Sequence, residues 1–219
     1  MSLNDIKYVD SLLVVKNALS HDQCDRLIHE FEDRIKIENG VYESCPHAVT
    51  GEKTFSTFKK LNLFPESDNF DVVKKTVSDI IKRWIEHLDQ KKSFHVHSLR
   101  RLLNFAHEFR LLRYNEGDKI HPHTDWDHFT HASFSLNLND DYQGGTMEFF
   151  NGKHSIRLGR GDAIIFPADS FWVHEIKPIE KGTRYSVNGF IISVPEKQRK
   201  ILNDIAHDIY DCEANEYRF

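Results

Sequence analysis

The second half of the chain consists of short segments in which apolar and polar residues alternate, separated by turn residues. Residues 133–138 alternate strictly, with apolar side chains at every second position. Such alternation predicts half-buried β-strands, because successive side chains on a strand point to opposite faces. Many short strands in close succession predict a sandwich or small barrel. Further strands are expected at 107–114, 146–150, 154–158, 162–166, 171–176 and 184–194.

The first half of the chain carries helical patterns. Residues 21–37 and 70–88 place apolar side chains at helical spacing, and the second stripe is the longer of the two. Ser20 and Gln23 form a capping-box pattern at the start of the first helix. Residues 94–106 fit a helix or a strand equally well. Weaker strand patterns lie at 8–16 and 53–64.

These patterns predict a single domain of 219 residues, mainly β with α, in which helices of the N-terminal half pack on a β-sandwich. We expect a helix-rich supporting part at 1–106, a β core at 107–194 and a C-terminal helix at 195–219. Residues 40–54 combine glycine, proline and polar residues, which predicts a loop. This loop is a candidate substrate lid.

Charge and cysteine content narrow the possible environments and partners. The formal net charge of −5 argues against duplex DNA or an anionic membrane as the main partner. Cys24, Cys45 and Cys212 are odd in number and far apart, which favours a reducing compartment over a disulfide framework. The first twenty residues carry charges that exclude a signal peptide, and no apolar run reaches membrane-spanning length. We therefore expect a soluble, cytoplasmic protein.

The first candidate for chemistry is the pair His123 and Asp125, separated by one residue. On a strand or strand end, residues two apart point the same way, so an imidazole and a carboxylate would meet at one point. These are two of the three ligands of a 2-His-1-carboxylate iron site. The nearby histidines at 121, 128 and 131 are rivals, but none is followed by aspartate two residues later.

The third ligand is expected from another strand, and His174 lies in a suitable one. Ten residues later, Arg184 and Ser186 share one strand face, where a forked guanidinium and a hydroxyl would anchor a carboxylate. Tyr114 precedes the first ligand and is a candidate for the same pocket. Trp172 is equally compatible with this pocket and with the core.

The ordered motifs between 107 and 194 resemble those of the 2-oxoglutarate- and Fe(II)-dependent dioxygenases, and within them the prolyl 4-hydroxylase branch. The segments that carry the resemblance are Tyr114–Gly117, His123–Asp125, Leu136–Asn139, Asp141–Phe149, Gly161–Pro167, His174–Glu175 and Gly182–Ser186. The resemblance implies a double-stranded β-helix (jelly-roll) core with supporting N-terminal helices.

The resemblance also implies roles for individual residues. His123, Asp125 and His174 would bind Fe(II), and Arg184 would pair with the distal carboxylate of 2-oxoglutarate, assisted by Ser186 and Tyr114. The expected cosubstrates are 2-oxoglutarate and O2, with ascorbate (vitamin C) as the reductant. The intact aspartate favours hydroxylation over halogenation, for which relatives carry a small residue at this position.

The expected function is hydroxylation of a protein or peptide by a prolyl 4-hydroxylase-like enzyme. One alternative is a hydroxylase of a free amino acid or other small metabolite, which would need a closed pocket with its own charged anchor. Another is a non-catalytic jelly-roll metal-binding module, although such a module usually lacks a ligand or the anchor. A nucleic-acid dealkylase is disfavoured because Phe190 stands where that branch places a second arginine. We expect no nucleic-acid or membrane partner.

Overall fold

The computed structural model describes residues 7–38, 44–47, 50–55, 57–92, 95–125, 129–195, 197–198, 201 and 216–219. Its helices are the 3-10 helix η2 (Tyr8–Ser11), α1 (His21–Glu38), α2 (Phe70–Lys91) and α3 (Val96–Leu102). Its strands are β1 (Leu13–Val15), β2 (Ser44–Pro46), β3 (Lys53–Phe55), β4 (Lys59–Asn62), β5 (Phe105–Tyr114), β6 (Ile120–His123), β7 (Thr130–Asn137), β8 (Gln143–Gly144), β9 (Met147–Phe149), β10 (His154–Ile156), β11 (Ala163–Pro167), β12 (His174–Ile176), β13 (Ile179–Lys181), β14 (Arg184–Ile192) and β15 (Glu216–Arg218).

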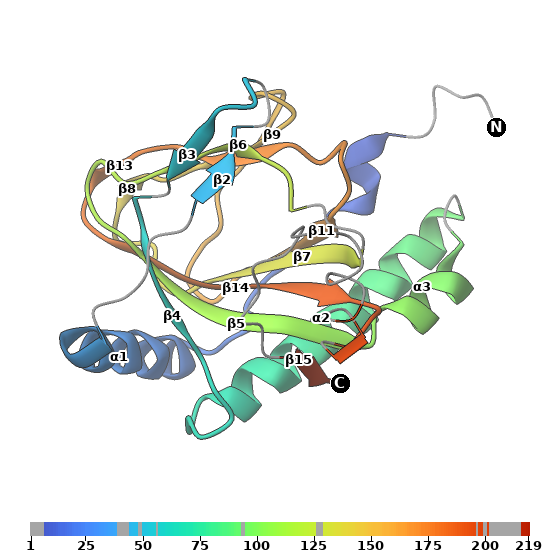
Figure 1. Cartoon of the computed structure of the whole chain (residues 1–219), viewed down its shortest axis with the longest axis horizontal. Coiled ribbons are helices and arrows are strands. Elements are labelled where there is room, and N and C mark those ends of the chain that lie inside the picture. Colours follow the sequence, from blue (N-terminus) through green and yellow to red (C-terminus); the bar gives the residue numbers. More distant parts are fainter. Residues whose placement is uncertain are drawn as a thin grey trace.

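Two antiparallel sheets make up the β core, as the alternating pattern predicts. The larger sheet has the order β1-β11-β7-β14-β5-β15, with β4 also paired to β5. The smaller sheet has the order β10-β9-β12-β6. Figure 1 shows the smaller sheet on one side of the larger one, with α1 and α2 on the other side. The helices therefore cover one face of the larger sheet and leave its opposite face to the smaller sheet.

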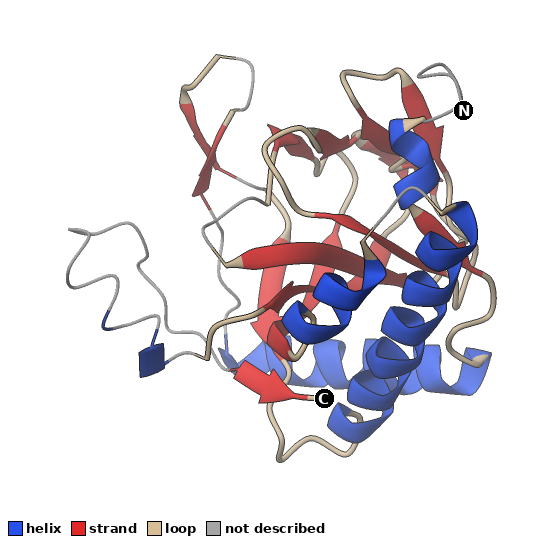
Figure 2. Ribbon diagram, turned by 90° about the vertical axis from the view of Figure 1, so that its right-hand side faces the viewer, coloured by secondary structure: helices blue, strands red, loops and turns tan. Residues whose placement is uncertain are grey.

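Helix α2 supplies the largest apolar face to the helix side of the larger sheet. Its buried side chains are Phe70, Val73, Val77, Ile80, Ile81, Trp84, Ile85 and Leu88. They pack with residues of the sheet such as Leu136, Ile165 and Val187 in one continuous core. Burial of each large apolar side chain contributes about 1.5–3 kcal/mol, so this interface fixes the sheet on its helical support. Figure 2 shows the two long helices on this side of the sheets.

A second apolar cluster lies between the two sheets. It contains Leu112 and Tyr114 from β5, Ile164 from β11, Phe149 from β9 and Ile176 from β12. Alternate residues of β5 and β11 thus face the helices and the smaller sheet in turn. The larger sheet is buried on both faces, and the space between the sheets is the place for a site.

The N-terminal part contributes more to the β core than the sequence pattern predicts. Residues 8–16 were expected to form one strand, but they form η2 followed by the short strand β1, which pairs with β11 at the edge of the larger sheet. Strand β4 pairs with β5 in the same sheet. The boundary predicted at residue 107 therefore does not separate helices from sheet. The ambiguous segment 94–106 contains α3 and the start of β5, and residue 94 lies outside the described residues.

Two other predictions need correction. The expected loop at 40–54 contains the hairpin of β2 and β3, whereas 40–43 and 48–49 lie outside the described residues. The C-terminal helix expected at 195–219 does not extend to its end, because 216–218 form β15, which pairs with β5. Residues 202–215, which carry most of that helical pattern, lie outside the described residues.

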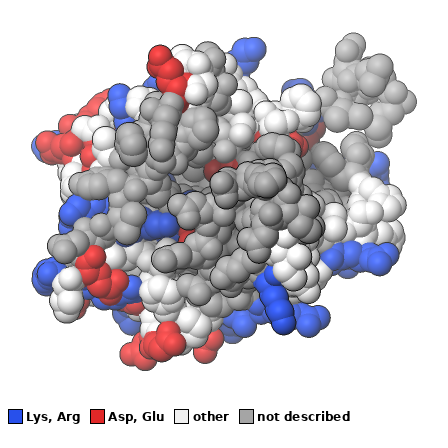
Figure 3. Space-filling view, viewed as in Figure 1, with Lys and Arg blue, Asp and Glu red and all other residues white. Residues whose placement is uncertain are grey.

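The exposed surface is mixed in charge. Basic and acidic side chains both lie around the edge of the face shown in Figure 3. No helix in the described part of the chain is long and apolar enough to cross a membrane.

The capping box predicted for α1 is confirmed and can be tested. The backbone N–H of Gln23 donates to Ser20 Oγ at 3.2 Å, and the backbone N–H of Ser20 donates to Gln23 Oε1 at 2.8 Å. We expect Ser20→Ala to lower the free energy of unfolding by about 1 kcal/mol, measured by urea denaturation. Ser155→Ala on exposed β10 is the control and should change it by less than about 0.5 kcal/mol. Equal stability of the two variants would contradict the capping role.

Candidate metal centre

The predicted histidines meet because β6 and β12 are neighbours in the smaller sheet. His123 and His174 stand directly opposite each other in this antiparallel pair, and their ring centroids are 4.3 Å apart. Both are buried. Asp125 follows the end of β6, and its Oδ1 and Oδ2 lie 3.4 Å from His123 Nε2 and 3.3 Å from His174 Nε2. The three predicted ligand atoms therefore converge on one point.

Backbone carbonyls orient both imidazoles. His123 Nδ1 lies 2.8 Å from the carbonyl oxygen of His121, and His174 Nδ1 lies 3.0 Å from that of Trp172. A carbonyl oxygen can only accept, so each Nδ1 carries the proton and each Nε2 presents a lone pair to the centre. Such contacts fix the tautomer and the ring orientation of histidines that bind metals.

The electrostatics of the three side chains favour positive charge at their centre. Burial alone would raise the pKa of Asp125, but the neighbouring imidazoles of His174 and His123 hold it well below its ordinary value. Burial alone would lower the pKa of His174, yet the Asp125 carboxylate raises it. The carboxylate is thus kept ionised in a buried position, where a metal ion can replace the protons that stabilise it.

The donor set fits Fe(II). In the part of the chain that the structure describes, His123, Asp125 and His174 are the one group of three or more such residues that could hold a metal ion, with all ligand atoms within 4.8 Å of one another. Two imidazoles and one carboxylate on one side of an ion leave positions open for other ligands, as in non-haem iron oxygenases.

The other candidates near this centre lie apart from it. His121 packs its ring against His47, with ring centroids 5.6 Å apart. His131 lines a separate cavity near Tyr8 and Trp84. His128 and Trp126 lie outside the described residues.

Trp172 packs in the inter-sheet core and does not line the cavity at the triad. Its ring stacks on Phe166 with centroids 5.8 Å apart. The sequence left open whether it was a core or a pocket residue, and it is a core residue whose carbonyl oxygen orients His174.

The predicted anchor residues are buried with unused hydrogen-bonding groups. Arg184 begins β14 opposite Tyr114 of β5, and its guanidinium carbon lies 5.1 Å from the centroid of the Tyr114 ring. Arg184 is only 2% exposed, yet its Nε and Nη1 have no hydrogen-bond partner among the described residues. Ser186 is fully buried on the same face of β14, and its hydroxyl also has none. Buried donors are nearly always paired in native proteins, so this arrangement suits an acceptor that arrives from outside the chain.

A cavity between the sheets connects these features with residues that the sequence did not single out. It is lined by the triad and by Phe58, Arg110, Leu112, Tyr114, Ile120, Ser133, Phe134, Ser135, Met147, Phe166, Ile176, Asn188, Gly189 and Phe190. The alternation at 133–138 did carry a signal for Ser133 and Ser135, since residues between the apolar positions must face the other way. Nothing in the sequence marked Arg110 or Asn188, whose position depends on strand register.

A jelly-roll core with two histidines and one carboxylate at its centre defines the class of non-haem iron oxygenases. Residues 109–192 match the family model of the 2OG-Fe(II) oxygenase superfamily. This part of the chain is similar to that superfamily, whose description implies Fe(II) and 2-oxoglutarate as cofactor and cosubstrate.

Curated relatives agree with this placement. A PKHD-type hydroxylase of Idiomarina loihiensis is 32% identical over 107 residues, which are 44% of this chain and 48% of the relative. A PKHD-type hydroxylase of Cupriavidus metallidurans is 33% identical over 104 residues, which are 45% of each chain. The chain spans about half the length of these relatives.

Solved structures show the same fold at low sequence identity. The viral collagen prolyl hydroxylase of Paramecium bursaria Chlorella virus-1 has a TM-score of 0.60 at 17% identity, covering 89% of this chain and all of that one. A prolyl hydroxylase of Trichoplax adhaerens, in complex with a hypoxia inducible factor peptide fragment, has a TM-score of 0.62 at 15% identity and covers 88% and 87%. The jelly-roll predicted from the motifs is confirmed.

The metal centre predicts different effects for Asp125→Ala, just after the end of β6, and for His121→Ala, within β6. We expect Asp125→Ala to abolish specific Fe(II) binding, measured by anaerobic calorimetry, because the only anionic ligand of the group is removed. His121→Ala keeps the backbone carbonyl that orients His123, so it should bind Fe(II) like the unmodified protein. Full binding by Asp125→Ala, or loss of binding in His121→Ala, would show that the ligands are different.

Proposed function

We propose that the protein is an Fe(II)- and 2-oxoglutarate-dependent dioxygenase that hydroxylates a C–H bond of a protein or peptide, in the manner of a prolyl 4-hydroxylase. The observation that carries this proposal is the convergence of His123, Asp125 and His174 in a cavity that also contains Tyr114, beside a buried Arg184 with unused donors. A site that holds a metal ion for structural reasons alone would need no buried guanidinium beside it. Binding of a dicarboxylate cosubstrate does need such a group.

In this proposal the triad holds Fe(II) through His123 Nε2, His174 Nε2 and a carboxylate oxygen of Asp125. When bound, Fe(II) with 2-oxoglutarate supplies the oxidising chemistry that inserts one atom of O2 into a C–H bond and releases succinate and CO2. The carbonyls of His121 and Trp172 keep the imidazoles in the tautomer that this binding requires.

Arg184 is the proposed anchor for the distal carboxylate of 2-oxoglutarate. Its guanidinium offers parallel N–H donors that match two carboxylate oxygens, and burial makes this contact strong because water does not compete. The Ser186 hydroxyl would donate to the same carboxylate. Tyr114 stacks on the guanidinium and restricts its orientation.

The cavity walls would exclude water from the reaction. Met147, Phe166 and Ile176 line it beside the triad and come from strands on both sheets. An apolar lining protects a reactive oxidant from side reactions with solvent. The chain's own task is thus to position the C–H bond and to keep the site dry.

The proposal that the substrate is a prolyl residue of a peptide is supported by the names of the structural neighbours, which are prolyl hydroxylases. A hydroxylase of a free amino acid or small metabolite is the second candidate, and Arg110 favours it because this residue supplies a charged group in the cavity beside the triad. A non-catalytic metal-binding module is disfavoured, because neither the ligands nor the anchor are missing.

Turnover tests the proposal directly. With Fe(II), ascorbate, O2 and 2-oxoglutarate, we expect succinate formation that is stimulated by proline-containing peptides, and a mass gain of one oxygen atom in the substrate. Mass spectrometry of peptides and of candidate metabolites measures both. Asp125→Ala is the inactive control. If no peptide, amino acid or lysate fraction stimulates succinate formation, the enzyme assignment is wrong.

The anchor predicts a selective kinetic effect. We expect Arg184→Ala to raise the KM for 2-oxoglutarate on the order of 100-fold, because two charge-assisted hydrogen bonds are lost. Arg113→Ala removes an arginine of the neighbouring strand that pairs with Glu32 at 3.0 Å on the helix side, so this KM should not change. An unchanged KM in Arg184→Ala would place the anchor elsewhere.

A further inference from the structure

A buried serine hydroxyl without a partner lies in the wall of the cavity that contains the triad. Ser133 of β7 is only 3% exposed, and its Oγ has no hydrogen-bond partner in the described part of the chain. It lines the same cavity as His123 and Asp125. An unpaired buried hydroxyl lowers stability unless a group from outside the chain satisfies it. This hydroxyl therefore marks a contact point for a ligand.

The surroundings of the hydroxyl are aromatic. Ser133 stands opposite Phe166 of β11 on one side and opposite Phe190 of β14 on the other, and both phenylalanines line the cavity. Directly opposite side chains on one face of a sheet are close neighbours, with Cβ atoms about 4.5–5.5 Å apart. The Phe166 ring lies 4.9 Å from the ring of His174, measured between centroids. The hydroxyl is thus a polar point between two aromatic walls, one of which adjoins a residue of the triad.

A second hydrogen-bonding group lies diagonally across from Ser133. Asn188 of β14 also lines the cavity and stands opposite Ser135, which is two residues after Ser133 on the same face of β7. Ser135 Oγ donates to Asn188 Oδ1 at 2.9 Å, so the carbonyl of this amide is used and its NH2 group makes no hydrogen bond with a described residue. We refer to Ser133 and Asn188 as the serine–asparagine pair. It offers an NH2 group that can only donate and a hydroxyl that can donate or accept.

The proposed anchor for the cosubstrate lies at a different point of the sheet. Ser186, the other buried hydroxyl without a partner, is beside Arg184 near the start of β14. Phe190, which stands opposite Ser133, is four residues beyond Ser186, and four residues along a strand span roughly 13 Å. A five-carbon dicarboxylate held at Ser186 is shorter than this separation. If Arg184 and Ser186 hold 2-oxoglutarate, Ser133 is left for the primary substrate.

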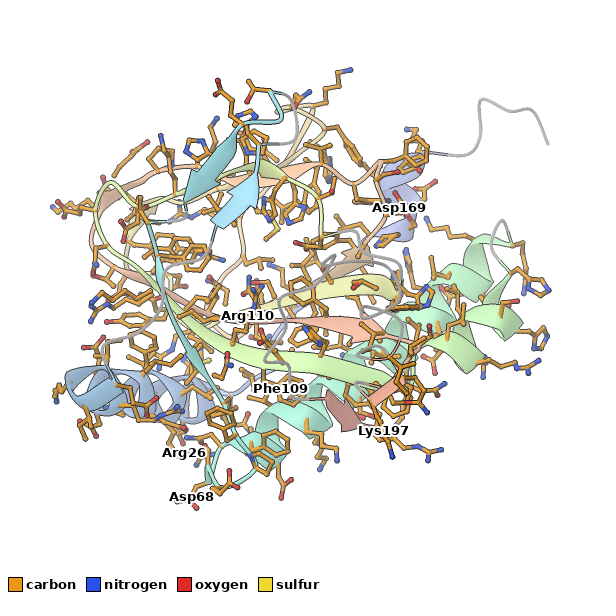
Figure 4. All side chains as sticks on the ribbon, in the orientation of Figure 1. Arg26, Asp68, Phe109, Arg110, Asp169 and Lys197 are labelled. Carbon is orange, nitrogen blue, oxygen red and sulfur yellow. The ribbon has the colours of Figure 1, made fainter. Side chains whose placement is uncertain are left out.

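The serine–asparagine pair is uncharged, and the cation of the same wall has partners within the chain. The Arg110 guanidinium carbon lies 4.5 Å from the centroid of the Phe190 ring, and its Nε lies 3.9 Å from the Glu108 carboxylate. Figure 4 shows Arg110 on the cavity side of the sheet and Phe109 on the side of α2. The wall therefore does not require an anion. Its open hydroxyl and amide suit a neutral ligand that offers both an acceptor and a donor.

An extended peptide backbone offers this combination. The N–H and C=O of one extended residue point to the same side, as they do when two antiparallel strands exchange a pair of hydrogen bonds. The C=O would accept from the NH2 group of Asn188, and the N–H would donate to Ser133 Oγ. A free amino acid instead carries an ammonium and a carboxylate, both charged at neutral pH, whose strongest partners are groups of opposite charge.

We propose that Ser133 and Asn188 bind the backbone N–H and C=O of one extended residue of a peptide substrate, next to the residue whose C–H bond faces the triad. This inference rests on the proposed function and selects a peptide over a free amino acid as its substrate class. Phe166 and Phe190 would contact apolar side-chain atoms of the bound peptide on either side of these hydrogen bonds.

Binding without turnover is the first test. The protein loaded with Fe(II) and 2-oxoglutarate is titrated by calorimetry in the absence of O2. The probes are a panel of acetylated and amidated peptides with proline between varied neighbours, the free L-amino acids, and analogues of the best-binding peptide in which each backbone N–H in turn is replaced by an ester oxygen. We expect peptides to bind and free amino acids not to bind. One ester position should weaken binding by roughly 10-fold, because the hydrogen bond to Ser133 is lost.

The two buried serine hydroxyls give a matched comparison. Ser133→Ala should weaken binding of the best peptide by roughly 10-fold, remove the effect of the sensitive ester position, and leave the affinity for 2-oxoglutarate unchanged. Ser186→Ala should weaken binding of 2-oxoglutarate instead, and leave the peptide affinity at saturating 2-oxoglutarate unchanged. Asn188→Asp keeps an acceptor for Ser135 but loses the NH2 group, so it should weaken peptide binding at least as much as Ser133→Ala.

The melting temperature of the ligand-free protein separates a ligand contact from a structural role. Loss of an unpaired buried hydroxyl removes a cost of folding. Ser133→Ala should therefore melt at or above the temperature of the unmodified protein, by up to roughly 4 °C, which also shows that the variant is folded. A lower melting temperature would show that the hydroxyl stabilises the fold, and would count against the ligand contact.

The outcomes separate this inference from the proposed function. No binding by any peptide of the panel, equal binding of free amino acids, or unchanged peptide affinity in Ser133→Ala would overturn the peptide contact. Succinate formation is then measured with every probe after O2 is admitted. Peptide hydroxylation with the same KM in Ser133→Ala and in the unmodified protein would keep the proposed function and reject this inference. Peptide binding that depends on Ser133, without succinate from any probe, would reject the proposed function instead.

Discussion

The antiparallel pairing of β6 with β12 is the contact on which the site depends. Register alone brings His123 opposite His174, and a displacement by one residue would turn one imidazole to the other face of the sheet. The carbonyl contacts at each Nδ1 then direct both lone pairs inward. Asp125 needs only to follow the end of β6 to complete the group. A short stretch of backbone hydrogen bonding thus determines the geometry of a metal site.

The space between the sheets is more polar than a typical β-sandwich core. The face of the larger sheet that packs against the helices is apolar and supplies stability, whereas its inner face carries the buried polar side chains of Arg184, Ser186 and Ser133. Buried donors without acceptors cost stability, typically about 1–3 kcal/mol each. A chain that tolerates several such donors would regain part of that free energy if a ligand with acceptor atoms bound to them. We therefore expect ligand-linked stability to be a general property of this inner face.

Sequence patterns predicted most of the helices and strands of this fold, and each prediction that failed has a physical reason. Period-two alternation predicted the strands at 133–138 and 184–194, and helical spacing predicted α1 and α2, because each pattern depends on local geometry. His123 and Asp125 could be named because they are separated by one residue, and His174 and Arg184 because the ordered motifs that contain them resemble those of a known family. Arg110 could not be named, because its place in the cavity wall follows from the pairing of β5 with β14, which are distant in the sequence. Segments of three residues such as β1 carry too little pattern to be separated from a 3-10 turn.

Strand β1 has a consequence for how the chain acquires its structure. Leu13 pairs with Ile165, so the edge of the larger sheet closes only after most of the polypeptide exists. Pairings between such distant residues give a high contact order, which slows folding and leaves strand edges open during synthesis. The matched family segment 109–192, expressed alone, would lack β1, β4 and the helical support. It would therefore present unpaired edges and an uncovered apolar face, and we expect it to aggregate rather than to act as an autonomous catalytic unit.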